Sequence, residues 1–513
     1  MPAACLMLQG TASGVGKSLL AAAFCRLFAR AGHRVAPFKA QNMSLNAAVT
    51  GDGGEIGRAQ AAQAEAAGLE PSVDMNPILL KPEGDDCSQL VVRGRAIARV
   101  SWREYRARQA ELAPVIAESL ARVRAAADVV VIEGAGSPAE INLRDADLVN
   151  MHVARLAAAP VLLVGDIDRG GVFAALAGTL ALLAPDDRAR VAGLIVNRLR
   201  GDAGILTPGL DELSARTGVP VLGVVPWIAE RLMPAEDSLD LDEMPAAGGA
   251  ALPEGAALVV DVAVVRLPRV ANFDDFEWLA AEPGVRVRWV SAPGALAEAD
   301  LIVLPGSKSV IADLAWLRAR GLAEAVVAAA AAGRPVLGVC GGYQMLGRTL
   351  RDPEGVESSV AEARGLGLLP VETTFASVKT TRRVRARVTA APGPFAGARG
   401  TVTGAYEIHA GVTRPLAGDV PRPFAIVERG GAPADDLDGA VAGSVTGTYL
   451  HGVLAGGAVR RALLGWLAVR AGRAAHPGWG SATPRLARWD RLADIVAGAL
   501  DVAAVGKLVG RPL

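Results

Sequence analysis

The amino-acid sequence predicts an α/β protein built from two parallel-sheet domains, and three observations support this prediction. The chain has 513 residues, of which 51% are hydrophobic and 21% charged, so it holds enough apolar material for more than one buried core. Short runs of Val, Ile and Leu alternate with Ala-rich stretches of helical spacing, a pattern typical of parallel strands joined by helices. An acidic segment rich in Pro, Gly and Ala, residues 230–255, separates two such series.

The first series predicts an N-terminal domain over residues 1–235, with a linker after it over residues 236–256. Stretches such as 18–31 and 110–127 have helical spacing and helix-forming residues. The expected buried strands are residues 5–9, 129–133, 161–165, 193–197 and 221–225. Because these strands are apolar along their length, we expect a parallel sheet that helices cover on both faces.

The second series predicts a C-terminal domain over residues 257–457. Its expected parallel strands are residues 259–265, 285–290, 301–304 and 336–339. After residue 365, Thr, Val and Arg alternate between glycine turns, for example in residues 371–375 and 383–388, which favours antiparallel strands. A helical tail is expected over residues 458–513.

Charge and hydropathy exclude several classes of protein. The 53 basic side chains balance 53 acidic ones, whereas a general nucleic-acid-binding protein carries a basic excess. The longest uncharged apolar runs are shorter than the ~18–20 residues that span a bilayer. No cationic leader precedes the first strand. We therefore expect a cytoplasmic protein without nucleic-acid or membrane partners, and we make no prediction of its oligomeric state.

A glycine-rich loop follows the first predicted strand and leads directly into a helix. It has the sequence GTASGVGKS over residues 10–18, one residue longer between its outer glycines than the common phosphate-binding pattern. Backbone N–H groups at Gly14 and Gly16 can approach a phosphate, while Lys17 neutralises its charge. The Ser18 hydroxyl can ligate Mg²⁺. We therefore predict an ATP-phosphate site here; the alternative is a glycine turn with an incidental lysine.

Polar side chains end three further predicted strands. Glu133 follows an apolar run, and an acid at this place beside a phosphate loop typically serves Mg²⁺; helix capping is the alternative. The Asn197 amide could contact an adenine edge or form an Asx turn. Asp166 and Asp168 could serve a metal or substrate, or cap the next helix.

A cysteine stands on a second strand-to-helix turn, in the sequence GVCGGYQMLG over residues 338–347. Such a turn projects a nucleophile from the sheet, and the helix N-terminus favours a thiolate and supplies N–H groups for an oxyanion hole. The turn LPGSKS, residues 304–309, could supply a second oxyanion donor. Cys340 is therefore the predicted nucleophile, with a buried inert thiol as the alternative.

A thiolate nucleophile needs a base, and the chain has only five histidines. His451, on a glycine-bounded segment late in the second domain, is the first candidate, and His409 is its rival. Cys5 and Cys25 lie in apolar stretches and are expected to be inert.

The two motifs, in this order, resemble the cobyric acid synthase family, glutamine-hydrolysing amidases of cobalamin biosynthesis. The resemblance covers nearly the whole chain. The N-terminal half resembles the dethiobiotin-synthetase type of P-loop fold, and the C-terminal half a class I glutamine amidotransferase of the cobyrinate-amidating type. The most specific sequence motifs are KAQNMSLN at 39–46, EIGRAQ at 55–60, MNP at 75–77, LKP at 80–82 and ANFDDF at 271–276.

The resemblance implies a role for each matched position. Cys340 corresponds to the glutaminase nucleophile and His451 to its base. The nucleotide-binding positions are Gly14, Gly16, Lys17, Ser18 and Asn197, with Ser18 and Glu133 as metal ligands. The candidate substrate contacts are Lys39, Gln41, Asn42, Asn46, Arg58 and Lys81.

The chain departs from the wider class I amidotransferases at one position. Those enzymes place a Glu two residues after the catalytic His, where this chain has Val453. The cobyrinate branch shares that absence, which implies a Cys–His dyad. The group that orients His451 is open, and Glu407 is a candidate.

The resemblance implies amidation of four peripheral carboxylates of adenosylcobyrinic acid a,c-diamide to give adenosylcobyric acid. ATP and Mg²⁺ are the implied cofactors, and a corrinoid and glutamine the implied partners. Two enzyme alternatives are cobyrinic acid a,c-diamide synthase and a P-loop amidase acting on another polycarboxylate. A non-enzymatic alternative, a partitioning or scaffold ATPase, has no need of Cys340 and His451.

Overall fold

The computed structural model describes residues 3–83, 86–230, 232–233, 259–416, 418–481 and 486–513. The predicted linker, residues 236–256, lies outside the described residues. The chain divides into two compact units. The N-terminal unit comprises residues 1–44, 55–234 and 483–513, and the C-terminal unit comprises residues 45–54 and 235–482.

The N-terminal unit is built on a sheet of six parallel strands in the order β12-β11-β10-β1-β9-β2. These strands are β1 (Ala4–Gly10), β2 (Val35–Phe38), β9 (Val129–Glu133), β10 (Val161–Asp166), β11 (Val191–Leu199) and β12 (Val221–Pro226). The prediction of a parallel sheet is confirmed, and β2 is a strand that the pattern did not indicate. Because β9 and β10 lie on opposite sides of β1, the loop after β1 opens at the point where the strand order reverses, a common ligand site in such sheets.

Helices connect these strands, as the alternating pattern predicted. They are α1 (Lys17–Arg30), α2 (Arg58–Ala66), α3 (Trp102–Ala107), α4 (Gln109–Ala126), α5 (Met151–Ala157), α6 (Val172–Leu182), α7 (Pro185–Arg188) and α8 (Thr207–Thr217). In the part of the chain that the structure describes, no helix combines the length and apolarity needed to cross a membrane.

The N-terminal unit also contains a small four-stranded sheet in the order β3-β6-β7-β8. Its strands are β3 (Gln41–Met43), β6 (Ile78–Pro82), β7 (Cys87–Val92) and β8 (Arg95–Ser101). The strand β5 (Glu55–Gly57) precedes α2 in the same unit, whereas β4 (Ala47–Val49) belongs to the C-terminal unit. Much of the sequence text that carried the family resemblance therefore forms this small sheet and its flanks.

The C-terminal unit has a mostly parallel sheet in the order β15-β13-β16-β18-β26-β25, in which only the edge strand β25 is antiparallel. Its strands are β13 (Val260–Val265), β15 (Val285–Val290), β16 (Leu301–Leu304), β18 (Val336–Val339), β25 (Ala440–Ala442) and β26 (Val445–Thr448). Its helices include α10 (Glu277–Ala280), α11 (Val310–Ala319), α12 (Leu322–Ala331), α13 (Gly341–Leu346) and α14 (Gly457–Arg470). All four predicted parallel strands are confirmed.

A second, largely antiparallel sheet completes this unit. Its strands are β19 (Thr349–Arg351), β20 (Glu362–Arg364), β21 (Val371–Val388), β22 (Val402–Pro415), β23 (Phe424–Arg429) and β24 (Ala432–Asp438). The segments predicted at 371–375 and 383–388 are two parts of the single long strand β21, which pairs with β22 and β23. A two-stranded ribbon, β14 (Val270–Ala271) with β17 (Gly306–Ser307), lies in the same unit.

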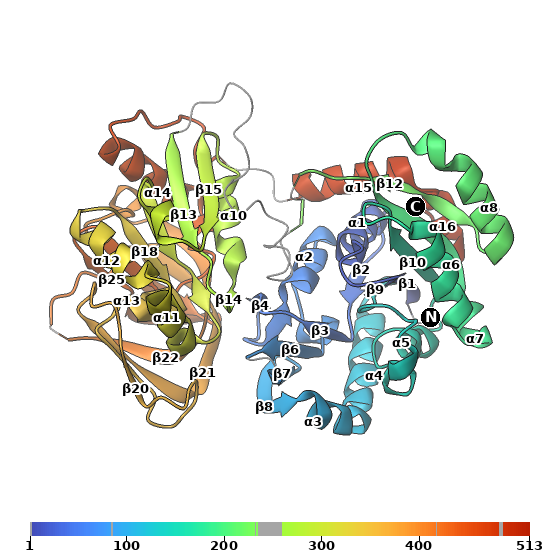
Figure 1. Cartoon of the computed structure of the whole chain (residues 1–513), viewed down its shortest axis with the longest axis horizontal. Coiled ribbons are helices and arrows are strands. Elements are labelled where there is room, and N and C mark those ends of the chain that lie inside the picture. Colours follow the sequence, from blue (N-terminus) through green and yellow to red (C-terminus); the bar gives the residue numbers. More distant parts are fainter. Residues whose placement is uncertain (1–2, 84–85, 231, 234–258, 417, 482–485) are drawn as a thin grey trace. The chain divides into compact units, whose positions relative to one another are not determined.

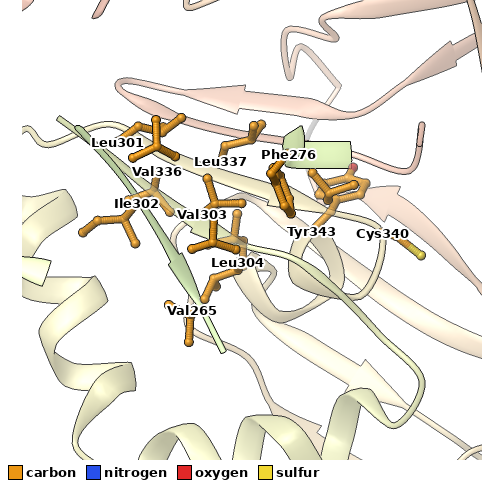
Figure 2. Close-up of a cluster of buried hydrophobic side chains, with 14 of the residues drawn as sticks. Val265, Phe276, Leu301, Ile302, Val303, Leu304, Val336, Leu337, Cys340 and Tyr343 are labelled. Atoms are coloured by element: carbon orange, nitrogen blue, oxygen red, sulfur yellow. The ribbon is translucent and has the colours of Figure 1, made fainter. Parts of the chain in front are cut away.

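Apolar side chains from the parallel strands form the core of the C-terminal unit (Figure 2). Ile302, Val303 and Leu304 of β16 are fully buried. Burying a side chain of this size contributes about 1.5–3 kcal/mol. Figure 2 shows Cys340 beside Tyr343 at the rim of this cluster, with its sulfur turned away from the strand side chains.

The predicted tail, residues 458–513, is divided between the two units. The helix α14 packs into the C-terminal unit, whereas α15 (Ala487–Ala499) and α16 (Val502–Val509) belong to the N-terminal unit. Figure 1 shows α15, in red, beside α1, in blue, although the two helices come from opposite ends of the chain. Amphipathic spacing predicts that a helix buries one face, but it does not identify the surface that covers this face.

Close packing fixes the end of α15 against β12. Gly223 and Leu500 form an antiparallel bridge. A Cβ on Gly223 would lie 2.2 Å from the Ala499 carbonyl oxygen, and the residue has φ +149°. Only glycine therefore fits this place in β12.

We predict that Trp489→Ala destabilises the N-terminal unit by about 3–5 kcal/mol, the usual cost of deleting a buried aromatic side chain. Trp489 is fully buried in the core that α15 shares with α1, and its Nε1 has no hydrogen-bond partner in the described structure, so the loss is one of packing. Hydrogen–deuterium exchange should show lower protection of β1 and β9. Leu508→Ala, at a position 37% exposed, is the control. Unchanged protection of these strands in Trp489→Ala would contradict the prediction.

Candidate active sites

The carboxyl edge of the N-terminal sheet carries the predicted phosphate loop. Gly14 and Gly16 have φ of 71° and 94°, a left-handed conformation that glycine adopts without steric cost. The Lys17 ammonium donates to the carbonyl oxygens of Ala12 at 2.8 Å and Gly136 at 3.1 Å. Because α1 begins at Lys17, its free N–H groups and the lysine charge both favour an anion at this loop.

Glu133 is the centre of a buried polar cluster at the end of β9. Its Oε1 accepts from the Ser18 hydroxyl at 2.8 Å and from the Lys39 ammonium at 2.7 Å, and its Oε2 accepts from the Gln63 amide at 2.6 Å. Three donors thus offset the cost of burying the carboxylate. The structure brings the predicted metal ligands Ser18 and Glu133 together. It also places Gln63 in the cluster, which the sequence patterns did not single out for a role.

The chemistry of this cluster fits a magnesium ion. Mg²⁺ prefers oxygen ligands, and here a hydroxyl and a carboxylate lie side by side. The Gln63 Oε1 is buried and has no hydrogen-bond partner among the described residues. Among the residues that the structure describes, no group of three or more His, Cys, Asp or Glu side chains could hold a metal ion. A cation at Ser18 and Glu133 would therefore need further oxygens, such as those of a bound triphosphate.

Asn197 supports the phosphate loop from the end of β11. Its amide nitrogen donates to the Val15 carbonyl oxygen at 2.8 Å. A Cβ on Gly16 would lie 2.2 Å from this nitrogen, so the loop passes close to the asparagine. The predicted contact of Asn197 with a nucleotide base stays a prediction.

The two aspartates after β10 are paired with arginines. Asp166 accepts from Arg198 at 3.0 Å, and Asp168 accepts from Arg200 at 2.6 Å. The Asp168 N–H also donates to the Asp166 carboxylate at 2.9 Å, closing a local turn. The Arg200 hydrogen bond lowers the pKa of the exposed Asp168. These contacts favour a structural role over the metal or substrate role that the sequence left open.

Several predicted substrate residues have partners within the N-terminal unit. Lys81 and Glu55 form a buried ion pair at 2.9 Å. The Asn42 amide donates to the Gln60 Oε1 at 3.1 Å, and both side chains are buried. Substrate contacts for Lys81 and Asn42 stay predictions, and these pairs show that both residues also fix the local fold.

Three further substrate candidates lie in different surroundings. Gln41 accepts a hydrogen bond from the Tyr105 hydroxyl, and Arg58 is half-buried at the start of α2. Asn46 is fully buried and belongs to the C-terminal unit, away from the other five in the division of the chain. Its contact with substrate also stays a prediction.

The predicted nucleophile lies on a sharp turn between β18 and α13. Cys340 has φ 51° and ψ −108°, a conformation that a residue with a side chain rarely adopts. Its N–H donates to the Thr448 carbonyl oxygen at 2.8 Å, which ties the turn to β26. Strain of this kind concentrates at functional sites and persists only where the surroundings hold it.

The glycines after Cys340 allow the turn 304–309 to approach. A Cβ on Gly342 would lie 1.9 Å from the Leu304 carbonyl oxygen, and one on Gly341 would lie 2.8 Å from the Ser307 nitrogen. Side chains at these positions would push the two turns apart. The predicted second oxyanion turn therefore lies against the nucleophile turn, although the structure does not test its role.

His451 is held by a carboxylate that the sequence analysis did not assign. Its Nδ1 contacts the Asp275 Oδ2 at 2.7 Å, and the Gly452 N–H donates to the Asp275 Oδ1 at 2.7 Å. Burial alone would lower the pKa of His451, but Asp275 and a hydrogen bond with Cys340 raise it above its usual range. The three side chains thus form a thiol–imidazole–carboxylate series that suits nucleophilic attack on an acyl group.

The candidate for orienting His451, Glu407, was wrong. Glu407 instead pairs with Arg429 at 2.8 Å and lies 3.9 Å from the His409 Nε2. The interacting residues Asp275 and His451 are 176 positions apart, so no local spacing could link them. The signal available in the sequence is the pair of adjacent aspartates in the segment 271–276, which also carries the family resemblance.

The rival base His409 and the other two buried cysteines lie in surroundings that do not favour catalysis. The His409 Nδ1 contacts the Gly411 carbonyl oxygen at 2.8 Å, and its ring stacks on Tyr449 with a centroid distance of 3.8 Å. Burial raises the pKa of the Cys5 and Cys25 thiols, in line with the expectation that these two cysteines are inert.

Comparisons with known proteins give two matching families. Residues 6–237 match the CobQ/CobB/MinD/ParA nucleotide binding domain, and residues 261–459 match the CobB/CobQ-like glutamine amidotransferase domain. A cobyric acid synthase from Sorangium cellulosum is 55% identical over 528 residues, covering 99% of this chain and 99% of the relative. Another from Rhodococcus jostii is 51% identical over 508 residues, covering 98% of this chain and 95% of the relative. A solved glutamine amidotransferase has 18% identity and a TM-score of 0.31, covering 40% of this chain and 98% of its own.

We predict that Asp275→Asn lowers the pKa of His451, because it removes the negative charge that stabilises the imidazolium. An NMR titration of the His451 ring proton should show the fall, and iodoacetamide should alkylate Cys340 more slowly. Glu407→Gln is the control, since Glu407 contacts Arg429 and not His451. An unchanged His451 pKa in Asp275→Asn, or an equal fall in both variants, would contradict the assignment.

Proposed function

The chain belongs to the cobyric acid synthase family, and we propose that it amidates four peripheral carboxylates of adenosylcobyrinic acid a,c-diamide, using ATP and glutamine, to give adenosylcobyric acid. One observation carries the proposal: a phosphate loop with Ser18 beside Glu133 and a Cys340–His451–Asp275 series occur in one chain. Such a pair of sites suits a reaction that must both activate a carboxylate and release ammonia. The relatives that match nearly the whole chain support the choice of acceptor.

The N-terminal unit would activate the acceptor. A carboxylate is a poor electrophile, so transfer of the ATP γ-phosphoryl group to a carboxylate oxygen gives an acyl phosphate that ammonia can attack. Attack forms the C–N bond and expels inorganic phosphate. Lys17 and the N-terminus of α1 would hold the phosphates in line, since positioning and charge neutralisation dominate phosphoryl transfer. A Mg²⁺ held by Ser18 and Glu133 would neutralise phosphate charge.

The C-terminal unit would supply the ammonia. The Cys340 thiolate would attack the side-chain amide carbon of glutamine, and the His451 imidazolium would protonate the departing ammonia. His451 would then take a proton from water as the water hydrolyses the thioester, which yields glutamate and restores Cys340. Asp275 fixes the imidazole so that the other ring nitrogen faces the sulfur.

The text of residues 39–46 and 75–77 supports cobyric acid synthase over the sister enzyme cobyrinic acid a,c-diamide synthase. A partitioning or scaffold ATPase is disfavoured, because such a protein needs no buried cysteine–histidine–aspartate series. An amidase acting on another polycarboxylate would share both sites, so product analysis must distinguish it.

We predict four successive amidations when the protein is incubated with ATP, Mg²⁺, glutamine and adenosylcobyrinic acid a,c-diamide. Mass spectrometry should show four steps, each with the mass change of replacing a hydroxyl group by an amino group. Omitting ATP is the control and should leave the corrinoid unchanged. Turnover of cobyrinic acid with none of the a,c-diamide would identify the sister activity instead.

We predict that two variants separate the half-reactions. Cys340→Ser should lose amidation with glutamine but keep it with ammonium salts, because ammonia bypasses the nucleophile. Lys17→Ala should lose amidation with either nitrogen source, since the ATP phosphates lose the positive charge that holds them in place. Glutamine-dependent product from Cys340→Ser would refute the nucleophile, and ammonia-dependent product at the wild-type rate from Lys17→Ala would remove the phosphate loop from the mechanism.

A further inference from the structure

A short segment of the N-terminal sequence, residues 45–54, belongs to the C-terminal unit although the residues on both sides of it belong to the N-terminal unit. Asn46 and the three residues of β4, which lie in the first half of this segment, are buried. Two sets of contacts inside the C-terminal unit connect this segment to His451. One leads to Asp275, which binds the histidine ring, and the other leads to Tyr406, which stacks on that ring.

The first route begins with a reciprocal pair of asparagines. The Phe273 N–H donates to the Asn46 Oδ1 at 3.3 Å, and the Ala47 N–H donates to the Asn272 Oδ1 at 3.1 Å. Asn272 has φ 53°, a left-handed conformation that Asn tolerates better than most residues. It immediately precedes the 3₁₀ turn Phe273–Phe276. These two hydrogen bonds therefore hold the segment against the start of this turn.

That turn carries the carboxylate of the glutaminase centre. Asp275 lies within it and binds both His451 and the Gly452 N–H. Asp275 and Asn272 are buried, so the turn has little freedom to shift without breaking these contacts. A displacement of Asn46 or Ala47 would move the carboxylate that fixes the imidazole.

The second route passes through the antiparallel sheet. The Arg383 Nε donates to the Val49 carbonyl oxygen at 2.7 Å, and Arg383 lies opposite Tyr406 in the β21–β22 ladder. Tyr406 and His451 exchange two backbone hydrogen bonds of 3.0 Å each. Their rings also stack, with centroids 5.2 Å apart and an angle of 19° between the planes. The segment thus also braces the strand that lines the other side of His451.

We propose that residues 46–49 position His451 and its partner Asp275 for the glutaminase reaction, through Asn272 on one side and Arg383 on the other. The proposal rests on the proposed function. The contacts of the segment lead to the histidine and its carboxylate, so its residues act through these two groups. It also gives Asn46 a role different from the substrate contact implied by the family resemblance.

Both ends of the segment continue into strands of the N-terminal unit. The Ser44 N–H donates to the Leu80 carbonyl oxygen of β6 at 3.0 Å, and Glu55 pairs with Lys81 of the same strand.

The test compares two matched pairs of variants in the full-length protein. Asn272→Gly removes the acceptor for Ala47 but keeps the left-handed backbone, whereas Asn272→Asp keeps an acceptor at the same place. Arg383→Ala removes the Val49 contact, whereas Arg385→Ala removes an exposed arginine two residues further along the same strand. The measurements are glutamine-dependent and ammonia-dependent amidation, and the rate at which 6-diazo-5-oxonorleucine, a glutamine analogue, labels Cys340.

We expect Asn272→Gly and Arg383→Ala to lower kcat with glutamine, and the labelling rate, on the order of tenfold to 100-fold, with KM for glutamine nearly unchanged. Ammonia-dependent amidation should stay within about twofold of wild type, because the N-terminal site does not use His451. Asn272→Asp should recover much of the lost rate, and Arg385→Ala should match wild type.

Wild-type glutamine kinetics in both Asn272→Gly and Arg383→Ala would overturn the inference, and so would an equal loss with both nitrogen sources, which indicates a general structural role. A wild-type protein that consumes no glutamine would instead refute the proposed function. The two failures are therefore distinguishable.

Discussion

A carboxylate taken out of water must be matched by donors, and each candidate site in this chain is arranged around one such group. Glu133 is buried and receives three side-chain donors, which hold together the start of α1, the residue after β2 and the helix α2. Asp275 is buried and engages an imidazole and a backbone N–H, which fixes the late histidine segment to the first turns of the C-terminal unit. Removing either carboxylate would take from its donors hydrogen bonds to a charged group, each of which contributes about 1.5–3 kcal/mol.

Both sites also use the same local construction, a buried strand followed by a glycine-rich turn and the N-terminus of a helix. At residues 10–18 this places N–H groups where a phosphate can bind. At Cys340 it places the thiol where N–H groups can stabilise negative charge on sulfur or on an acyl oxygen. The glycines serve different purposes: Gly14 and Gly16 supply positive φ, whereas Gly341 and Gly342 leave room for a neighbouring turn.

Sequence patterns predicted those features that depend on residues close together in the chain. Apolar runs identified most of the parallel strands, although not β2 or β26, and strand-end glycine turns predicted the two turns that carry Lys17 and Cys340. The partner of His451 escaped detection, because Asp275 contributes no periodicity and lies 176 residues away. The resemblance implied substrate contacts for Lys81, which the structure pairs with Glu55 in a buried site, so a lysine in a family motif can form a structural ion pair. The sequence likewise predicted a helical tail over residues 458–513 but could not show that α15 of this tail packs against α1.

The order in which the chain visits its two units has a consequence for how the protein is made. The polypeptide enters the N-terminal unit, crosses to the C-terminal unit at residues 45–54, returns, crosses again, and finally comes back with α15 and α16. Synthesis proceeds from the N-terminus, so the first unit cannot close its core until the last helices have left the ribosome. The C-terminal unit, in turn, must recruit a segment translated long before the rest of it. We therefore expect the two units to complete folding together after translation ends, and a gene split at the linker to yield two incomplete cores rather than two independent proteins.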